Sequence, residues 1–197
     1  MRRRHPLRGL AALLAPLLLA AAVVAADEPS FKAGVFSPPR AAPEFSLRGS
    51  DGAELRLGRY RGKVVILEFG FTACPDVCPT TLAALAAARK ALGADASELQ
   101  VVYLTVDPER DDAERLRTYL AAFDPTFVGG TGSEEQLAAV RKDYGIAATR
   151  TTAGSGYGFS HSSYTYLIDR EGNLRALMPY GHTSDDYVHD VKILLKR

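Results

Sequence analysis

A closely spaced pair of cysteines constrains this chain more than any other feature of its sequence. Cys74 and Cys78 are the only cysteines among 197 residues, and they stand in the segment Cys74-Pro75-Asp76-Val77-Cys78-Pro79. Two thiols separated by three residues can form one disulfide, hold one soft metal ion, or alternate between these states. The pair alone does not distinguish these uses. The flanking segments indicate the fold that carries the thiols and the chemistry for which they are used.

The flanking segments predict a strand before the pair and a helix after it. Residues 63–69 are nearly all apolar, which is the pattern of a strand covered on both faces. Leucines continue at helical spacing in an Ala-rich stretch over about 79–92, and Gly93 ends that helix. A dithiol that follows a buried strand and opens a helix is the thioredoxin-like arrangement.

The rest of the chain alternates strands and helices. We expect strands at 99–106 and 127–128, helices that begin at capping boxes on Asp111 and Ser133, a C-terminal helix, β-hairpins at 45–57 and 164–178, a Gly-rich turn at 129–132 and a Gly/Ser-rich loop at 153–160. These elements predict an α/β fold, a thioredoxin-like sandwich with a mixed central sheet flanked by helices and with added β-hairpins.

The N-terminus has the composition of an export signal. A basic stretch ends at Arg8, an uncharged run follows over 9–26, and small residues precede Asp27. The run of 18 residues reaches the lower limit for crossing a bilayer, so a cleaved signal and a retained anchor both fit. The predicted layout is a signal peptide or N-terminal membrane anchor at 1–26, a linker at 27–42 and the folded domain at 43–197. We expect the domain in the periplasm, soluble or tethered to the inner membrane, where disulfides persist.

The charge balance excludes one class of partner. Outside the first 26 residues, 20 basic side chains face 23 acidic ones, and no run of lysine or arginine occurs. A mildly acidic domain of this kind lacks the basic surface that binds nucleic acid, so we expect no nucleic-acid partner.

The prolines predict different environments for the two thiols. Each cysteine directly precedes a proline, and a residue before proline is pushed out of the α region. Cys78 is therefore expected at the N-cap of the helix, with Pro79 at its first position. The helix dipole at that end favours a thiolate, which predicts a lowered pKa for Cys78. A static disulfide remains an alternative, although a bridge that stabilises a fold usually closes a longer loop.

The number of soft ligands favours copper over other metals. Structural zinc sites and iron–sulfur clusters require four protein ligands, whereas Cu(I) is stable with fewer. A nitrogen ligand would complete a three-coordinate site, and His161 is the candidate because it follows the 153–160 loop and precedes a strand. A lone histidine is more often simply packed or solvated, and His5, His182 and His189 are expected in such ordinary positions.

Three segments together resemble the motifs of one known family. Residues 69–82 (FGFTACPDVCPTTL), 106–111 (VDPERD) and Ser160-His161-Ser162 before 166–169 are similar, in this order, to the signatures of Sco/SenC proteins. The resemblance covers about 43–197, and Ala73 departs from it where family members often carry histidine. It implies a thioredoxin-like fold that binds one copper ion through Cys74, Cys78 and His161. It also implies a role in assembling the dinuclear copper centre of cytochrome c oxidase.

The resulting hypothesis is a copper metallochaperone rather than an enzyme. Thiolates of Cys74 and Cys78 and neutral His161 would hold copper as Cu(I), or as Cu(II), and a redox disulfide between the cysteines would remove two ligands. The expected partners are the copper-receiving subunit of cytochrome c oxidase or another periplasmic copper protein, and a thiol reductant. Asp107 lies after a strand, where it would orient His161 or contact Cu(II), or would only end the strand.

Other uses of the same dithiol stay open. A thiol–disulfide oxidoreductase would keep the partner's copper-ligand cysteines reduced, although its usual spacing is C-x-x-C. A redox or copper sensor would bind without transfer. A peroxidase is disfavoured, because Thr72 stands two residues before Cys74 instead of three.

Overall fold

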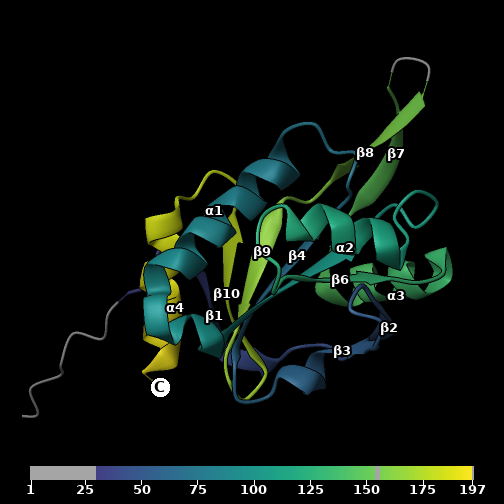
Figure 1. Cartoon of the computed structure of the whole chain (residues 1–197). Coiled ribbons are helices and arrows are strands. Elements are labelled where there is room, and N and C mark those ends of the chain that lie inside the picture. Colours follow the sequence, from purple (N-terminus) through teal and green to yellow (C-terminus); the bar gives the residue numbers. More distant parts are fainter. Residues whose placement is uncertain (1–29, 154–155, 197) are drawn as a thin grey trace, which may run out of the picture.

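The computed structural model describes residues 30–153 and 156–196, which form a mixed eight-stranded sheet with helices on both faces (Figure 1). The strands of this sheet are β1 (Gly34–Ala41), β2 (Ser46–Gly49), β3 (Glu54–Arg56), β4 (Val64–Gly70), β5 (Leu99–Thr105), β6 (Val128–Thr131), β9 (Tyr164–Ile168) and β10 (Asn173–Pro179). The helices are α1 (Val77–Leu92), α2 (Ala113–Ala121), α3 (Glu134–Tyr144) and α4 (Ser184–Leu195), with short 3-10 helices η1 (Leu57–Tyr60) and η2 (Gly93–Glu98). A separate hairpin pairs β7 (Ala148–Ala153) with β8 (Gly156–His161). The predicted α/β sandwich with a mixed sheet is confirmed.

The strand order is β1-β10-β9-β4-β5-β6-β2-β3. The strands β4, β5 and β6 pair in parallel, and the other neighbours in the sheet pair antiparallel. Every residue of β4 is buried, as its apolar sequence predicted. The carboxyl end of β4 leads directly into the loop that carries the first cysteine.

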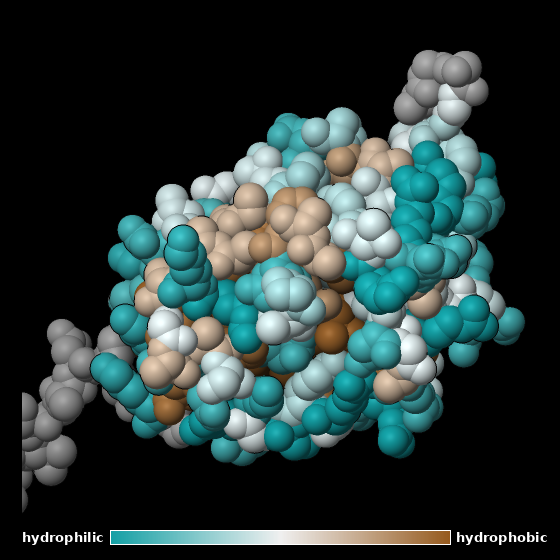
Figure 2. Space-filling view, in the orientation of Figure 1, coloured by the Kyte–Doolittle hydropathy of each residue, from teal (hydrophilic) through white to brown (hydrophobic). Residues whose placement is uncertain are grey.

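Alternation along β4 divides the core into two parts. Val65, Leu67 and Phe69 face the side covered by α3, whereas Val64 and Ile66 face the side covered by α1, α2 and α4. By the same alternation Glu68 and Gly70 lie beneath α1. The outer surface of α1 is rich in alanine, and Figure 2 shows apolar side chains over this helix between hydrophilic borders.

The structure differs from the predicted layout at the N-terminal side of the domain. Residues 34–41 lie within the expected linker but form β1, an edge strand that pairs with β10. Nearly all of its side chains are exposed, so the segment has no hydrophobic periodicity that would mark a strand. The expected signal or anchor at 1–26 lies outside the described residues. Within residues 30–153 and 156–196, none of the helices has the length and apolar character needed to cross a bilayer.

Two further local expectations were wrong. Gly129 and Gly130 belong to β6, where they pair with β5, instead of a turn. A side chain on Gly130 would press against Leu104 and Leu55 in the core, so the position requires glycine. The cap of α2 is Asp112, whose carboxylate accepts the Arg115 backbone N–H at 2.8 Å. The capping box on Ser133 and the hairpins β2–β3 and β9–β10 are confirmed.

Asp111, predicted as that cap, instead ties the cysteine loop to the sheet. Its buried carboxylate accepts the Thr72 backbone N–H at 2.9 Å and the Thr105 hydroxyl at 2.8 Å. Thr72 follows β4 and Thr105 ends β5, so one carboxylate holds both chain segments at the edge where the site lies.

The segment predicted as a Gly/Ser-rich loop is largely a hairpin. β7 and β8 pair from Ala148↔His161 to Ala153↔Gly156 and project from the main sheet (Figure 1). Glycine, serine and threonine dominate both strands, so composition indicated a loop where cross-strand hydrogen bonds make a ribbon. His161 is the last residue of β8, which gives its backbone a fixed position.

Candidate metal centre

Cys78 lies inside the first turn of α1 and not at its N-cap. The N-cap is Asp76, and Val77, Cys78 and Pro79 are the first three helical residues. The first four N–H groups of a helix have no intrahelical acceptor, so Pro79 loses no helical hydrogen bond at its position. The helix therefore begins two residues earlier than the proline spacing suggested, and this carries the Cys78 side chain into the core with 0% exposure.

The structure brings both thiols and His161 together. The Cys78 backbone N–H donates to the sulfur of Cys74 at 3.5 Å, and the two cysteines are not joined by a disulfide. The sulfur of Cys78 lies 3.9 Å from Nε2 of His161. Three separate elements thus meet at one point: the loop after β4, the first turn of α1 and the end of β8.

The hydrogen bond of the imidazole sets its tautomer. Nδ1 of His161 lies 3.0 Å from the Ser162 carbonyl oxygen, which can only accept, so Nδ1 carries the proton. The lone pair of Nε2 is then free on the side of the Cys78 sulfur. The ring of Phe71 packs edge-on against the imidazole at a centroid distance of 6.0 Å and restricts its rotation.

The two thiols titrate in opposite directions. A hydrogen bond from the Cys78 thiol, with further help from backbone N–H groups, lowers the pKa of Cys74 to about 5. The same interaction with Cys74, together with burial, raises the pKa of Cys78. The prediction of a lowered pKa for Cys78 was therefore wrong, because the single proton of the pair stays on the buried sulfur. The half-buried Cys74 is therefore the more readily ionised of the two cysteines.

Asp107 contacts the hairpin that carries His161. Its buried carboxylate accepts the Tyr157 hydroxyl at 3.0 Å and also pairs with the Arg110 guanidinium. Tyr157 lies on β8, and the guanidinium carbons of Arg110 and Arg150 lie 3.9 Å and 3.5 Å from its ring centroid. Among the described residues no hydrogen bond joins Asp107 to the imidazole, so any orienting effect passes through the hairpin.

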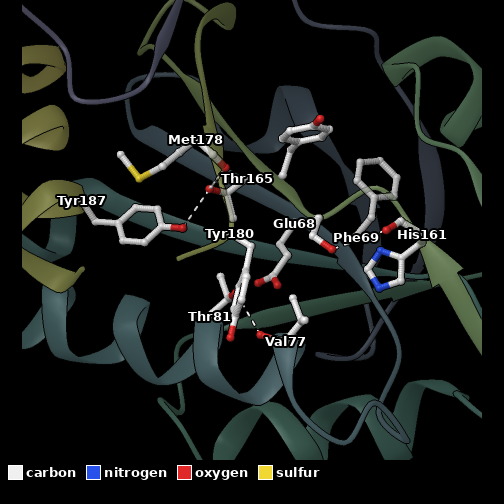
Figure 3. Close-up of a pocket in the computed structure, with 11 residues that line it drawn as sticks. Glu68, Phe69, Val77, Thr81, His161, Thr165, Met178, Tyr180 and Tyr187 are labelled. Atoms are coloured by element: carbon white, nitrogen blue, oxygen red, sulfur yellow. Dashed lines mark hydrogen bonds between the residues drawn. The ribbon is translucent and has the colours of Figure 1, made fainter. Parts of the chain in front are cut away.

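Sequence reasoning missed two buried polar residues beneath the site. Glu68, on β4, is 4% exposed, and its carboxyl group points into a small pocket beside His161, near Thr81 and Tyr180 (Figure 3). Burial raises the pKa of Glu68 well above its usual range, which favours the neutral form of the acid. Tyr103, on β5, is fully buried next to it. A carboxyl residue within the otherwise apolar run of 63–69 was the available signal for Glu68.

The remaining described histidines lie in ordinary positions. His182 contacts Asp186 at 3.3 Å near the start of α4, and His189 contacts Asp190 at 2.9 Å. His5 lies outside the described residues. Within the described part of the chain, no group of three or more His, Cys, Asp and Glu residues is already arranged to hold a metal ion. The side chains gathered around the Cys78 sulfur offer sulfur and imidazole nitrogen, which are donors that soft metal ions favour.

Fold and site together define a class: a thioredoxin-like α/β protein that presents a dithiol and a histidine at the carboxyl edge of its parallel strands. The sequence model of the SCO1/SenC family matches residues 36–196. This chain belongs to the SCO1/SenC family.

Individual relatives agree with this assignment. A Stutzerimonas stutzeri protein named for copper binding is 39% identical over 138 residues, which are 69% of this chain and 68% of that protein. A SCO2-like protein of Rickettsia prowazekii is 35% identical over 65% of this chain and 64% of its own length. Among solved structures, Arabidopsis thaliana ScoI with copper bound superposes with a TM-score of 0.74 at 33% identity, covering 80% of this chain and 99% of ScoI.

Proposed function

We propose that this protein is a copper metallochaperone that binds one copper ion through Cys74, Cys78 and His161. The observation that carries the proposal is the meeting of two cysteine sulfurs and an imidazole ring, with 3.9 Å between the Cys78 sulfur and Nε2 of His161. Membership of the SCO1/SenC family supports it, as do the copper-bound structure of the Arabidopsis relative and the name of the Stutzerimonas relative.

The two thiols have different tasks in this proposal. The Cys74 thiolate is half-buried and already charged, so it meets incoming Cu(I) first and contacts the recipient during release. Cys78 gives up its proton as the ion enters, because metal ligation requires the thiolate. Nε2 of His161 completes a three-coordinate site, and an incoming thiol of the recipient can occupy the open side before the resident sulfurs leave.

The recipient follows from the family resemblance. We propose that copper is delivered for assembly of the dinuclear centre of cytochrome c oxidase, through its copper-receiving subunit or another periplasmic copper protein. The proposed location is the periplasm, with the domain soluble or tethered by the N-terminal segment. A disulfide between Cys74 and Cys78 would prevent loading, so a thiol reductant is a required partner.

A second candidate function is thiol–disulfide exchange with the recipient's cysteines. The low pKa of Cys74 favours it, since a thiolate attacks a disulfide sulfur. Cys74 would form a mixed disulfide and release one partner thiolate. Cys78, after losing its proton, would attack the Cys74 sulfur and release the second partner thiolate. The two electrons gained by the partner disulfide come from Cys74 and Cys78, which become a disulfide.

A copper titration of the reduced full-length protein tests the primary proposal. Cu(I) is supplied in competition with the chelator bathocuproine disulfonate, and Cys74→Ala, Cys78→Ala and His161→Ala are compared with wild type. One tightly bound equivalent that is lost or greatly weakened in each variant supports the three-ligand site. His182→Ala is the matched control, because that histidine lies at the start of α4 with Asp186. Binding that is indifferent to His161→Ala would overturn the three-ligand proposal.

A further inference from the structure

Two buried polar atoms beneath the site have no hydrogen-bond partner among the described residues: the hydroxyl oxygen of Tyr103 and Oε2 of Glu68. The two residues are register partners on the parallel strands β5 and β4, on the face covered by α1. A buried polar group without a partner destabilises a fold, and native proteins contain few of them. Two such groups side by side under the cysteines therefore indicate a role in the site.

Gly70 shows what the Tyr103 hydroxyl faces. A Cβ atom at Gly70 would clash with the hydroxyl oxygen of Tyr103 and would lie 2.7 Å from the sulfur of Cys78. Both atoms therefore border the same small space, and only glycine leaves that space empty. Glu68 differs, because its carboxyl group points into the pocket beside His161 (Figure 3). Tyr103 is the unpartnered group that faces the sulfur.

The sulfur of Cys78 is the group that this hydroxyl faces across the space left open by Gly70. As an uncharged thiol, that sulfur is a weak acceptor. A metal-bound sulfur is a thiolate, which accepts hydrogen bonds more strongly because it carries charge. On this face of α1 the hydroxyl of Thr81 already donates to the Val77 carbonyl oxygen at 3.0 Å, and Leu82 and Leu85 carry no donor.

We infer that Tyr103 is a positioning residue whose hydroxyl donates a hydrogen bond to the Cys78 sulfur when that sulfur is a copper-bound thiolate. The inference deepens the proposed function and depends on it. Tyr103 stabilises the loaded state at the expense of the metal-free fold, in which its hydroxyl faces only the weakly accepting thiol sulfur of Cys78. It also fixes the orientation of the sulfur, because Gly70 and the ring of Tyr103 define the direction from which the hydrogen bond arrives.

Tyr103→Phe in the full-length protein tests the inference, because the substitution removes only the hydroxyl. Tyr60→Phe is the matched control, since Tyr60 is also buried with an unpartnered hydroxyl but packs in the core on the opposite face of the sheet. We expect the metal-free Tyr103→Phe protein to melt at or above the wild-type temperature, while its Cu(I) dissociation constant rises about 10-fold, the usual scale for one charge-assisted hydrogen bond. In the Cu(II)-loaded protein the sulfur-to-copper charge-transfer band should move to longer wavelength. Tyr60→Phe should also melt at or above the wild-type temperature, but it should change neither the Cu(I) dissociation constant nor the charge-transfer band.

The outcomes separate this inference from the proposed function. If wild type and Tyr103→Phe bind Cu(I) with the same affinity and have the same charge-transfer band when loaded with Cu(II), the inference is overturned and the metallochaperone proposal stands. Wild-type protein that binds no copper overturns both. A Tyr103→Phe protein that loses stability and copper affinity together also overturns the inference, because that result indicates a structural hydroxyl.

Discussion

The pKa of Cys74 can be tested through its reactivity in the reduced, metal-free protein. The hydrogen bond from the Cys78 thiol is the main cause that lowers the pKa of Cys74 to about 5. An ordinary thiol has a pKa of about 8.5. At pH 5 Cys74 is about half ionised, whereas an ordinary thiol is ionised to only about 0.03%.

These values predict a specific pH profile for attack on a disulfide. At pH 5 the thiolate fraction of Cys74 exceeds that of an ordinary thiol by a factor on the order of 10³. A thiolate of lower pKa is a weaker nucleophile, and for this difference in pKa the loss is about 40-fold. Cys74 should therefore react about 40-fold faster than N-acetylcysteine at pH 5 and at a similar rate at pH 7. The sign follows from a lowered pKa: reactivity is lost only as the pH falls through about 5.

The assay is stopped-flow reaction with 2,2′-dithiodipyridine from pH 3.5 to pH 9, with N-acetylcysteine measured in parallel to correct for protonation of the reagent. Cys78→Ala removes the hydrogen bond and should move the midpoint for Cys74 upward, toward the ordinary range. The return is partial, because the backbone N–H groups of residues 76 and 78 remain. A wild-type midpoint near 8.5, or the same midpoint in both proteins, would refute the reasoning.

Two further substitutions test the supports of the site. Gly70→Ala forces a methyl group to 2.7 Å from the Cys78 sulfur, and overpacking of this kind costs about 1–3 kcal/mol of unfolding free energy, measurable by urea denaturation. Gly34→Ala, whose added atom meets only a carbonyl oxygen at 3.6 Å, is the control, and equal stability losses in both variants would contradict the clash. Tyr157→Phe removes the donor to Asp107 and should speed amide hydrogen exchange over 156–161 and weaken copper binding through His161. Unchanged exchange in that strand would show that Asp107 does not hold the hairpin.

The local elements of the fold could be predicted from the sequence because their signals are local. The apolar run at 63–69, the capping box on Ser133 and the turn glycines of two hairpins each specify a backbone conformation within a few residues. The cysteine spacing and its place between a strand and a helix likewise indicated a thioredoxin-like dithiol. The predicted ligands lie together in the structure, although their role in binding copper remains a proposal.

The strands at the edges of the fold could not be predicted in the same way. β1 is almost fully exposed, and β7 and β8 consist mainly of small and polar residues, so none of them has a periodic apolar pattern. Each of these segments is a strand because an adjacent strand supplies backbone hydrogen bonds. Which strand lies adjacent depends on how the whole chain folds. For this reason His161 was expected between a loop and a strand, whereas it is the last residue of β8.

The chemistry of the thiols was likewise decided by tertiary structure. The sequence determined that two thiols would stand at the start of a helix, but their pKa values depend on which sulfur is buried. An earlier helix start places Cys78 in the core and leaves Cys74 half-exposed, which reverses the predicted assignment of the thiolate. Strand register then places Tyr103 and Glu68 beneath Cys78, from positions 35 residues apart in the sequence. Burial and register are long-range properties, because the neighbours that exclude water from a side chain come from distant parts of the chain.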